Sequence, residues 1–359
     1  MDIIFNPPVN SENQYIRLIV DELKAKGYRI HALDNFFSSF GHFKSIRLVH
    51  LNWFENIDDS NFFTALKSFF RKMVVLIAIR LSGKPLVWTM HNRTSHEKGK
   101  AFFSRILVYF LLRWTRRIVI HTHQSEHMLA NINSKRARKT VYIPHPNFIG
   151  VYGDIISPVT PVVPQLHLLF TGMVKPYKNL EMLIEVVQQF HDEVQLVIAG
   201  RATDPVYQKQ VAKQAASAGN VKLLPYFIPD EKLAGLITKA DVLVLPYDLE
   251  SSLNSGTAIL AFSLKKTVIC PEIGTITDLG MLQDRVFHYR YGNAAEHRGA
   301  LTNQIAGALL LKQENPLKLQ EMGTRLYDHV EKVHDRHSIG MQLDHIYRAL
   351  IRKEVMKTT

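Results

Sequence analysis

Two lysines follow an apolar segment near the middle of the chain, in the run FTGMVKPYKNLEMLIEVV at residues 170–187. The pattern predicts a strand, a turn that carries Lys175 and Lys178, and then an amphipathic helix. At such a junction, backbone N–H groups, a helix N-terminus and ammonium groups can bind one anion. We therefore expect a diphosphate-bearing ligand to bind in the second half of the chain. The alternative is an ordinary surface turn with two solvated lysines.

A second group of polar residues follows the apolar segment 85–90 in the first half of the chain. The sequence HNRTSHE contains His91, Asn92, His96 and Glu97. Ligands bind at the carboxyl ends of parallel strands, so these side chains are candidates for a site. Another apolar segment precedes three more histidines: His121, His123 and His127. Zinc is an alternative use for such loops, but it needs three or four matched ligands, and we expect no metal.

The lysine-bearing turn and the histidine-rich segments can form sites only where strand ends meet at the edge of a sheet. The chain alternates apolar strand patterns with helical patterns. Strands are predicted at 2–5, 28–33, 46–51, 85–90, 117–121 and 140–143, and again at 166–171, 194–199, 221–225, 241–245, 267–270 and 285–289. Residues 293–356 are predicted to be helical. The alternation indicates two doubly wound, Rossmann-like α/β domains that face a cleft. No GxGxxG follows either first strand, which disfavours a dinucleotide site.

The boundary between the two domains is expected in the segment 150–165, which carries three prolines and no apolar periodicity. We therefore predict domains at 1–155 and 165–335. Near the start of the chain, Ser11 and Gln14 have the spacing of a helix capping box, and Gly27 is a typical helix stop.

Composition fits a globular protein with two cores, since 46% of the 359 residues are hydrophobic and 21% are charged. The one cysteine, Cys270, excludes an intramolecular disulfide framework and a cysteine-based zinc site, and it fits a reducing compartment. The first residues, MDIIFNPPVN, have no basic segment followed by a long apolar run. We therefore expect no signal peptide and a cytoplasmic location.

The formal net charge of +12 favours anionic partners. Aromatic residues do not interleave with a basic stripe, so we expect no nucleic-acid partner. The segments 65–84 and 100–117 mix apolar and basic residues, and neither has an uncharged run long enough to span a membrane. We expect them to lie on an anionic membrane surface, at the inner face of the cell membrane. The alternative is that both are domain helices whose apolar stripe faces a core.

Several short motifs together resemble family 4 glycosyltransferases of the GT-B fold. In the second half these are VKPYKNLEMLI, AGR at 199–201, and the stretches 221–247 and 255–278. In the first half NQYIRLIVDELKAKGYRI, LVHLNW, VWTMHNRTSHE and YIPHPNF resemble a subset that works on bacterial surface polysaccharides, including exopolysaccharide and capsule. The resemblance covers nearly the whole chain.

The resemblance implies transfer of a hexose from a UDP- or GDP-sugar to a glycan or polyprenyl-linked acceptor, with retention and without a cofactor. It also implies that the N-terminal domain binds the acceptor, that a C-terminal helix at 336–356 packs back on this domain, and that the C-terminal domain binds the nucleotide sugar. His91, Lys175 and Lys178 take catalytic roles. The donor-binding residues are Gly172, Lys175, Lys178, Arg201, Ser255, Gly256, Thr257 and Asp278, and the acceptor-side residues are Asn92, His96 and Glu97.

The chain departs from the family pattern at three positions. Met173 stands where the family has an arginine, and Ser252 and Leu260 stand in the slots of a glutamate pair, with Glu250 nearby. These departures favour one alternative function, a non-catalytic accessory subunit that keeps the fold and scaffolds a partner glycosyltransferase.

Overall fold

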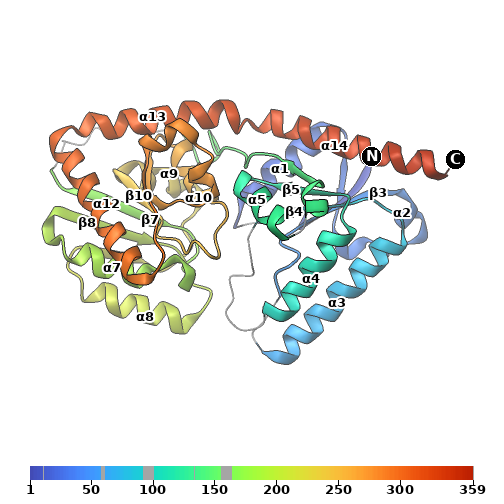
Figure 1. Cartoon of the computed structure of the whole chain (residues 1–359), viewed down its shortest axis with the longest axis horizontal. Coiled ribbons are helices and arrows are strands. Elements are labelled where there is room, and N and C mark those ends of the chain that lie inside the picture. Colours follow the sequence, from blue (N-terminus) through green and yellow to red (C-terminus); the bar gives the residue numbers. More distant parts are fainter. Residues whose placement is uncertain (11, 58–60, 92–100, 133, 155–163, 359) are drawn as a thin grey trace. The chain divides into compact units, whose positions relative to one another are not determined.

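The computed structural model describes residues 1–10, 12–57, 61–91, 101–132, 134–154 and 164–358. The chain divides into two compact units. Unit 1 consists of Met1–Pro146 and His334–Thr359, and unit 2 consists of Asn147–Val333. Figure 1 labels their helices and strands.

Unit 1 contains a six-stranded parallel sheet in the order β2-β1-β3-β4-β5-β6. Its strands are β1 Asp2–Asn6, β2 Arg29–His31, β3 Ile46–Asn52, β4 Leu86–Met90, β5 Arg117–Ile120 and β6 Thr140–Tyr142. Its helices are α1 Gln14–Ala25, η1 Leu33–Asn35, α2 Phe40–Ser45, α3 Phe62–Leu81, α4 Ala101–Trp114, α5 His123–Ile132, α6 Ser134–Ala137 and α14 Arg336–Thr358.

Unit 2 contains a second six-stranded parallel sheet, in the order β12-β11-β10-β7-β8-β9. Its strands are β7 Leu166–Thr171, β8 Val194–Ala199, β9 Val221–Leu224, β10 Val242–Val244, β11 Thr267–Pro271 and β12 Phe287–Tyr289. Its helices are η2 Pro176–Lys178, α7 Leu180–Gln188, η3 His191–Glu193, α8 Pro205–Ala216, α9 Asp230–Lys239, α10 Gly256–Ser263, α11 Gly274–Thr277, η4 Gly280–Arg285, α12 Ala294–Glu314 and α13 Pro316–Val333.

The predicted architecture of two doubly wound α/β units is confirmed, and every predicted strand overlaps an observed one. The helical stretch at 293–356 is also confirmed, as α12, α13 and α14. Whether the two units face a cleft stays a prediction. The capping prediction for α1 was wrong, because Asn13 is the N-cap and its side chain accepts a hydrogen bond from the Tyr15 N–H at 2.9 Å.

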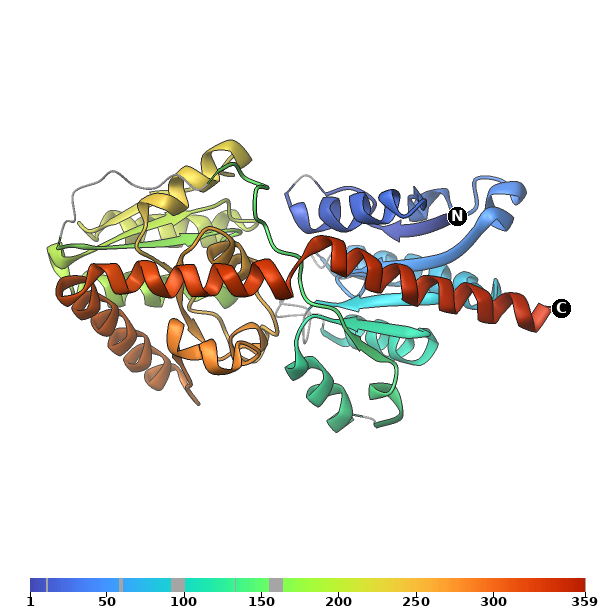
Figure 2. The ribbon, with the colours of Figure 1, turned by 90° about the horizontal axis from the view of Figure 1, so that it is seen from above.

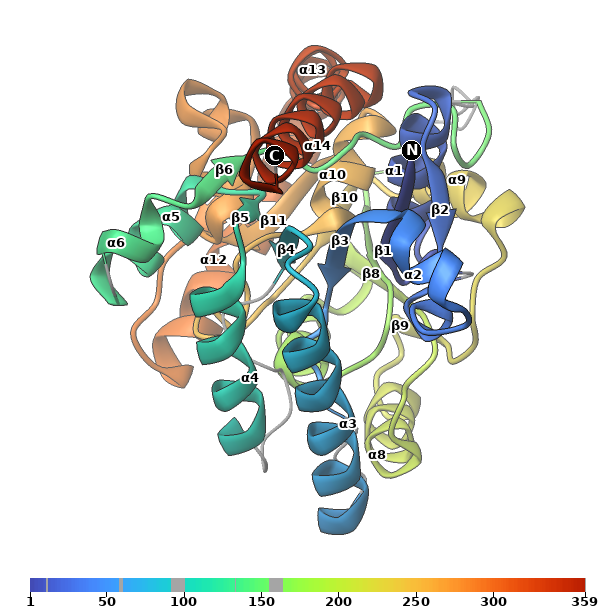
Figure 3. The same ribbon diagram turned by 90° about the vertical axis from the view of Figure 1, so that its right-hand side faces the viewer.

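Helices cover both faces of the unit 1 sheet. Helices α3 and α4 pack against each other on one face, where they lie side by side in Figures 1 and 3. On the other face α14 packs against α1 and β3, and Figure 2 shows it crossing the strands. Gly340 permits this close packing, since a Cβ atom there would lie 2.9 Å from the Cβ of Glu22.

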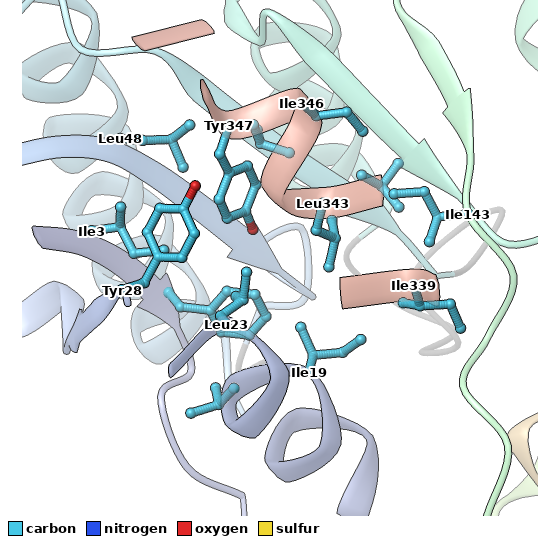
Figure 4. Close-up of a cluster of buried hydrophobic side chains, with 14 of the residues drawn as sticks. Ile3, Ile19, Leu23, Tyr28, Leu48, Ile143, Ile339, Leu343, Ile346 and Tyr347 are labelled. Atoms are coloured by element: carbon cyan, nitrogen blue, oxygen red, sulfur yellow. The ribbon is translucent and has the colours of Figure 1, made fainter. Parts of the chain in front are cut away.

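The apolar core between α1, α14 and the sheet fixes the position of α14 (Figure 4). Ile339, Leu343 and Tyr347 of α14 are buried against Ile19 and Leu23 of α1. Each such side chain contributes about 1.5–3 kcal/mol when it is fully buried. The C-terminal helix therefore forms part of the core of unit 1.

Candidate functional site

Two glycines are in close contact where β7 and β8 end. Gly172 has a φ of +125°, and its N–H donates to the Ala199 carbonyl at 3.0 Å. Gly200 follows β8, and a Cβ atom there would lie 1.8 Å from the Gly172 carbonyl oxygen. Only glycine permits this approach, which brings the ends of β7 and β8 together and directs the lysine-bearing turn.

Lys178 is buried at the end of this turn, with 8% of its surface exposed. Its Nζ lies 4.1 Å from the centre of the Tyr247 ring and also faces the rings of Tyr177 and Phe170. Within the described part of the chain, Lys178 has no carboxylate partner. The reading of this residue as a solvated surface lysine is therefore wrong. Its charge is held by aromatic faces, which attract cations but do not neutralise them.

The N-terminus of α10 lies beside the same aromatic ring. The Ser255 hydroxyl contacts the Tyr247 hydroxyl at 3.3 Å and accepts a hydrogen bond from the Ala258 N–H at 3.1 Å, so Ser255 is the N-cap of the helix. Thr257 also hydrogen-bonds Tyr247. The N–H groups of Gly256 and Thr257 are in the first turn, where a helix has no internal acceptor for them.

These residues lie at the switch point of the unit 2 sheet. Strands β7 and β10 are neighbours, and the chain winds outward from them in opposite directions. In open α/β sheets, ligands bind beyond the carboxyl ends of the strands at this point. The structure therefore brings Gly172, Lys178, Ser255 and Thr257 together around Tyr247, a residue that the sequence analysis missed.

The other predicted donor residues have backbone roles here. The Lys175 carbonyl accepts from the Lys178 N–H at 3.0 Å, and the Arg201 carbonyl accepts from the Val174 N–H at 3.0 Å. Asp278 is the C-cap of α11, and its N–H donates to the Gly274 carbonyl at 2.9 Å. Ser252 and Leu260, the two positions where the resemblance predicts glutamates, are buried.

A group of histidines surrounds Tyr15 at the carboxyl edge of the unit 1 sheet. His91, His121 and His145 follow β4, β5 and β6, and their rings lie 5.1, 5.4 and 5.0 Å from the Tyr15 ring. Trp53 stacks on His91 at 4.1 Å. The sequence analysis proposed His91, but it assigned no role to Tyr15, Trp53 or His145. Their only sequence signal is their position next to a predicted strand end or helix start.

Burial makes these imidazoles weak bases. Desolvation lowers the pKa of His121 to about 4 and that of His145 to about 3, and it holds the pKa of His91 well below its usual value. His121 Nδ1 donates to the Ile143 carbonyl at 2.8 Å, which leaves Nε2 as an acceptor. This buried Nε2 has no hydrogen-bond partner among the described residues. The cluster therefore offers neutral hydrogen-bonding groups to a ligand, such as sugar hydroxyls.

Three acceptor-side candidates, Asn92, His96 and Glu97, lie outside the described residues. Across the residues that the structure does describe, no group of His, Cys, Asp or Glu is arranged to hold a metal ion.

Comparison with known proteins agrees with this geometry. Residues 165–302, which lie within the lysine-bearing unit, match the family described as "Glycosyl transferases group 1". A GDP-mannose:glycolipid 4-beta-D-mannosyltransferase of Xanthomonas campestris is 28% identical over 230 residues, which are 62% of this chain and 61% of that protein. The chain has the GT-B fold, and its residues 165–302 are similar to this glycosyltransferase family.

Solved structures share this GT-B fold along almost the whole chain. Sucrose-phosphate synthase from Thermosynechococcus elongatus has a TM-score of 0.73 at 17% identity, with 98% of this chain and 99% of that chain covered. Anabaena HepE in complex with UDP-glucose has a TM-score of 0.70 at 13% identity, with 97% and 99% covered. The prediction of a GT-B fold is therefore confirmed.

One helix of this GT-B chain presents an apolar stripe to solvent. Phe63, Phe70, Val74, Ile77 and Leu81 of α3 are between 43% and 81% exposed. Their spacing of seven, four, three and four residues places them on one face of the helix. On α4, Leu107 and Leu111 are buried whereas Phe102 and Tyr109 are exposed. Contact of either helix with a membrane stays a prediction. No helix in the described part of the chain is long and apolar enough to cross a membrane.

The buried histidines predict that acid destabilises unit 1. Their pKa values are lower in the folded state than in the unfolded chain, so stability is fully present above pH 6.5 and is lost as the pH falls. Burial lowers the pKa of His50 to about 3. Protonation of this residue on unfolding should therefore lower the free energy of unfolding by about 2 kcal/mol between pH 7 and pH 5. The measurement is urea unfolding followed by tryptophan fluorescence, since all three tryptophans lie in unit 1.

The variant His50→Gln should reduce this pH dependence by about 2 kcal/mol, whatever its effect on stability at pH 7. The control is His127→Gln, which replaces an exposed histidine of α5. Identical pH dependence in His50→Gln and the parent protein would contradict the interpretation.

Proposed function

We propose that the chain is a glycosyltransferase that moves a hexose from a nucleotide sugar to a glycan or lipid-linked acceptor in the synthesis of a surface polysaccharide. The observation that carries the proposal is the buried ammonium of Lys178, beside the N-terminus of α10 and without a carboxylate partner in the described residues. Buried charges in proteins are normally paired, so this position suits an anion from outside the chain.

The chemistry of a nucleotide sugar fits this position. Cleavage of its glycosidic bond transfers negative charge to the β-phosphate of the leaving group. A cation and helix N–H groups at that phosphate stabilise the transition state more than the ground state. In this proposal unit 2 binds the donor, with Lys178 and the first turn of α10 at the diphosphate. Lys175, Arg201 and Asp278 complete the donor site.

GDP-mannose is the first donor to test. The name of the similar Xanthomonas mannosyltransferase gives GDP-mannose as its donor. This chain spans about 61% of that protein's length, so the same donor for this chain is part of the proposal. A thermal-shift screen with GDP- and UDP-sugars tests it, since a bound donor raises the unfolding temperature. Retention stays a prediction from the resemblance. The relative is named for a beta linkage, and the anomer of the product decides between retention and inversion.

Unit 1 binds the acceptor in this proposal. Its neutral, buried histidines suit the uncharged hydroxyl groups of a glycan, whereas unit 2 offers a cation. His91 is the candidate for contact with the reacting sugar, with Asn92, His96 and Glu97 on the acceptor side.

A non-catalytic accessory subunit is the second candidate. It is favoured by Ser252 and Leu260, which are buried and carry no carboxylate at the two positions where the resemblance predicts glutamates. Release of nucleoside diphosphate from a nucleotide sugar by the purified chain would exclude it.

The exposed stripe of α3 supports membrane contact. Single exposed apolar residues are common, but a stripe along a whole helix marks an interaction surface. Lys67, Arg71 and Arg105 are exposed on α3 and α4. Because basic residues beside apolar ones suit an anionic leaflet, we include the inner membrane surface among the partners.

Loss of the Lys178 charge should slow transfer strongly. Lys178→Met keeps most of the apolar stem, so the packing against Tyr247 should persist. We expect kcat to fall by roughly 30- to 1,000-fold, equivalent to about 2–4 kcal/mol of transition-state stabilisation. The assay is nucleoside diphosphate release, and the control is Lys209→Met at an exposed position on α8. Activity above half that of the parent would rule out a role at the leaving group.

His91→Ala should separate transfer from donor binding. Transfer should fall roughly twofold to tenfold, the effect of about 0.5–1.5 kcal/mol for a hydrogen bond between neutral groups. Donor affinity, measured by calorimetry, should stay unchanged because the donor binds to unit 2. Equal loss of donor affinity and transfer would show that His91 acts in folding or in the donor site.

Vesicle binding tests the α3 stripe. The parent protein should co-sediment with anionic vesicles at low salt and be released at high salt. Phe70→Ser with Val74→Ser should weaken binding at least roughly tenfold, because each side chain loses about 1 kcal/mol or more of apolar burial. The control pair is Val206→Ser with Met281→Ser, exposed apolar residues of unit 2. Equal binding by the two pairs would contradict the role of α3.

A further inference from the structure

Unit 1 has a cavity of about 620 Å³ at the edge of the sheet opposite the histidines. It is lined by Leu86 and Arg117, the first residues of β4 and β5, whereas His91 and His121 follow the last residues of these strands. At about 3.3 Å per residue, the five residues of β4 separate the two edges by roughly 16 Å. The cavity is therefore distinct from the candidate acceptor site.

The lining of this cavity is strongly cationic. Seven basic side chains and one carboxylate, Glu354, line it, a formal excess of six positive charges. They come from α3 and its following turn, from α4, from the start of β5, from the turn before β6 and from α14: Arg80, Lys84, Arg113, Arg116, Arg117, Lys139 and Lys353.

Four of these cations support the walls, and one of them, Arg117, donates to the Arg116 carbonyl at 3.4 Å. Lys84 donates to the Ile46 carbonyl at 2.6 Å, and Lys139 donates to the carbonyls of Leu112 and Arg113 at 3.1 and 3.0 Å. Arg116 pairs with Glu354 at 3.1 Å. These cations bind carbonyl groups at the ends of helices and strands or pair with a carboxylate. They therefore have a structural role in the fold of unit 1.

The other cations of the lining have no such structural role. In the ranges that the structure describes, the exposed side chains of Arg80, Arg113 and Lys353 have neither a carboxylate nor a carbonyl partner. Repulsion between cations acts at the wall of the cavity, because burial and the charges of Arg136, Arg116 and Arg113 lower the pKa of Lys139. Like charges this close destabilise the folded protein unless an anion neutralises them.

We propose that this cavity binds a phosphate-bearing ligand. Guanidinium groups match phosphate oxygens in a two-pronged geometry, and four of the seven cations are arginines. The volume falls within the usual range of ligand sites. Ile79, Trp114 and Leu350 add apolar lining, which suits the phosphate headgroup of an anionic lipid as well as a soluble phosphate.

The test uses two variants with equal changes in charge. The cavity variant is Arg80→Gln with Arg113→Gln, two exposed residues whose removal breaks no ion pair of the described structure. The control variant is Arg17→Gln with Lys24→Gln, exposed positions on α1. All proteins also carry Lys178→Met, so that the proposed donor site does not bind the probe. The probes are inorganic pyrophosphate in calorimetry and phosphatidylglycerol-containing vesicles in co-sedimentation, both at low salt.

We expect at least one probe to bind the cavity variant roughly tenfold or more weakly than the control variant, because each basic residue adds roughly fivefold to the affinity for an anionic surface and two are removed. Weaker pyrophosphate binding identifies a soluble phosphate ligand, and a loss confined to vesicles identifies a lipid headgroup. The proposal is overturned if the two variants bind both probes equally, or if neither probe binds the control. Glycosyl transfer is not measured, so a failure here is distinguishable from a failure of the proposed function.

Discussion

Parallel strand pairing is the constraint on which the whole arrangement depends. Every strand pair in both sheets is parallel, so all carboxyl ends in a unit meet at one edge. Lys178 and Tyr247 follow neighbouring strands in unit 2, and His91, His121 and His145 follow consecutive strands in unit 1. Residues far apart in sequence therefore converge without long loops. The amino edge of the unit 1 sheet remains available for a separate purpose, and the cationic cavity lies there.

The buried polar groups of the two units differ in charge. In unit 1, desolvation lowers the pKa values of the histidines, and the neutral rings pack on Tyr15 and Trp53. In unit 2, Lys178 lies among aromatic faces that interact with a cation without cancelling its charge. A neutral cluster suits hydroxyl groups and an uncancelled cation suits a diphosphate. This difference in electrostatics is the physical basis for assigning acceptor and donor to separate units.

The sequence predicted what depends on local pattern. Apolar runs located every strand, and the alternation of strands with helices predicted the doubly wound architecture. It did not predict contacts between distant segments, such as Tyr15 with His145 or Lys178 with Tyr247. The sequence also suggested the wrong N-cap for α1. Asn13 lies nearer the first turn of the helix than Ser11 and is the N-cap. The exposed stripe of α3 was ambiguous, since this helix is apolar on both its buried and its exposed faces.

Charge distribution connects these features. The excess of six cations around the cavity equals half of the net charge of +12 of the whole chain, although its lining comes from only a few short segments of unit 1. A positive net charge by itself only favours anionic partners in general. Concentrated at one edge of one sheet, and away from the candidate sugar sites, it indicates a specific anion. If that anion is a lipid headgroup, the cavity and the apolar stripe of α3 give unit 1 two different kinds of contact with a membrane, one electrostatic and salt-sensitive and the other apolar.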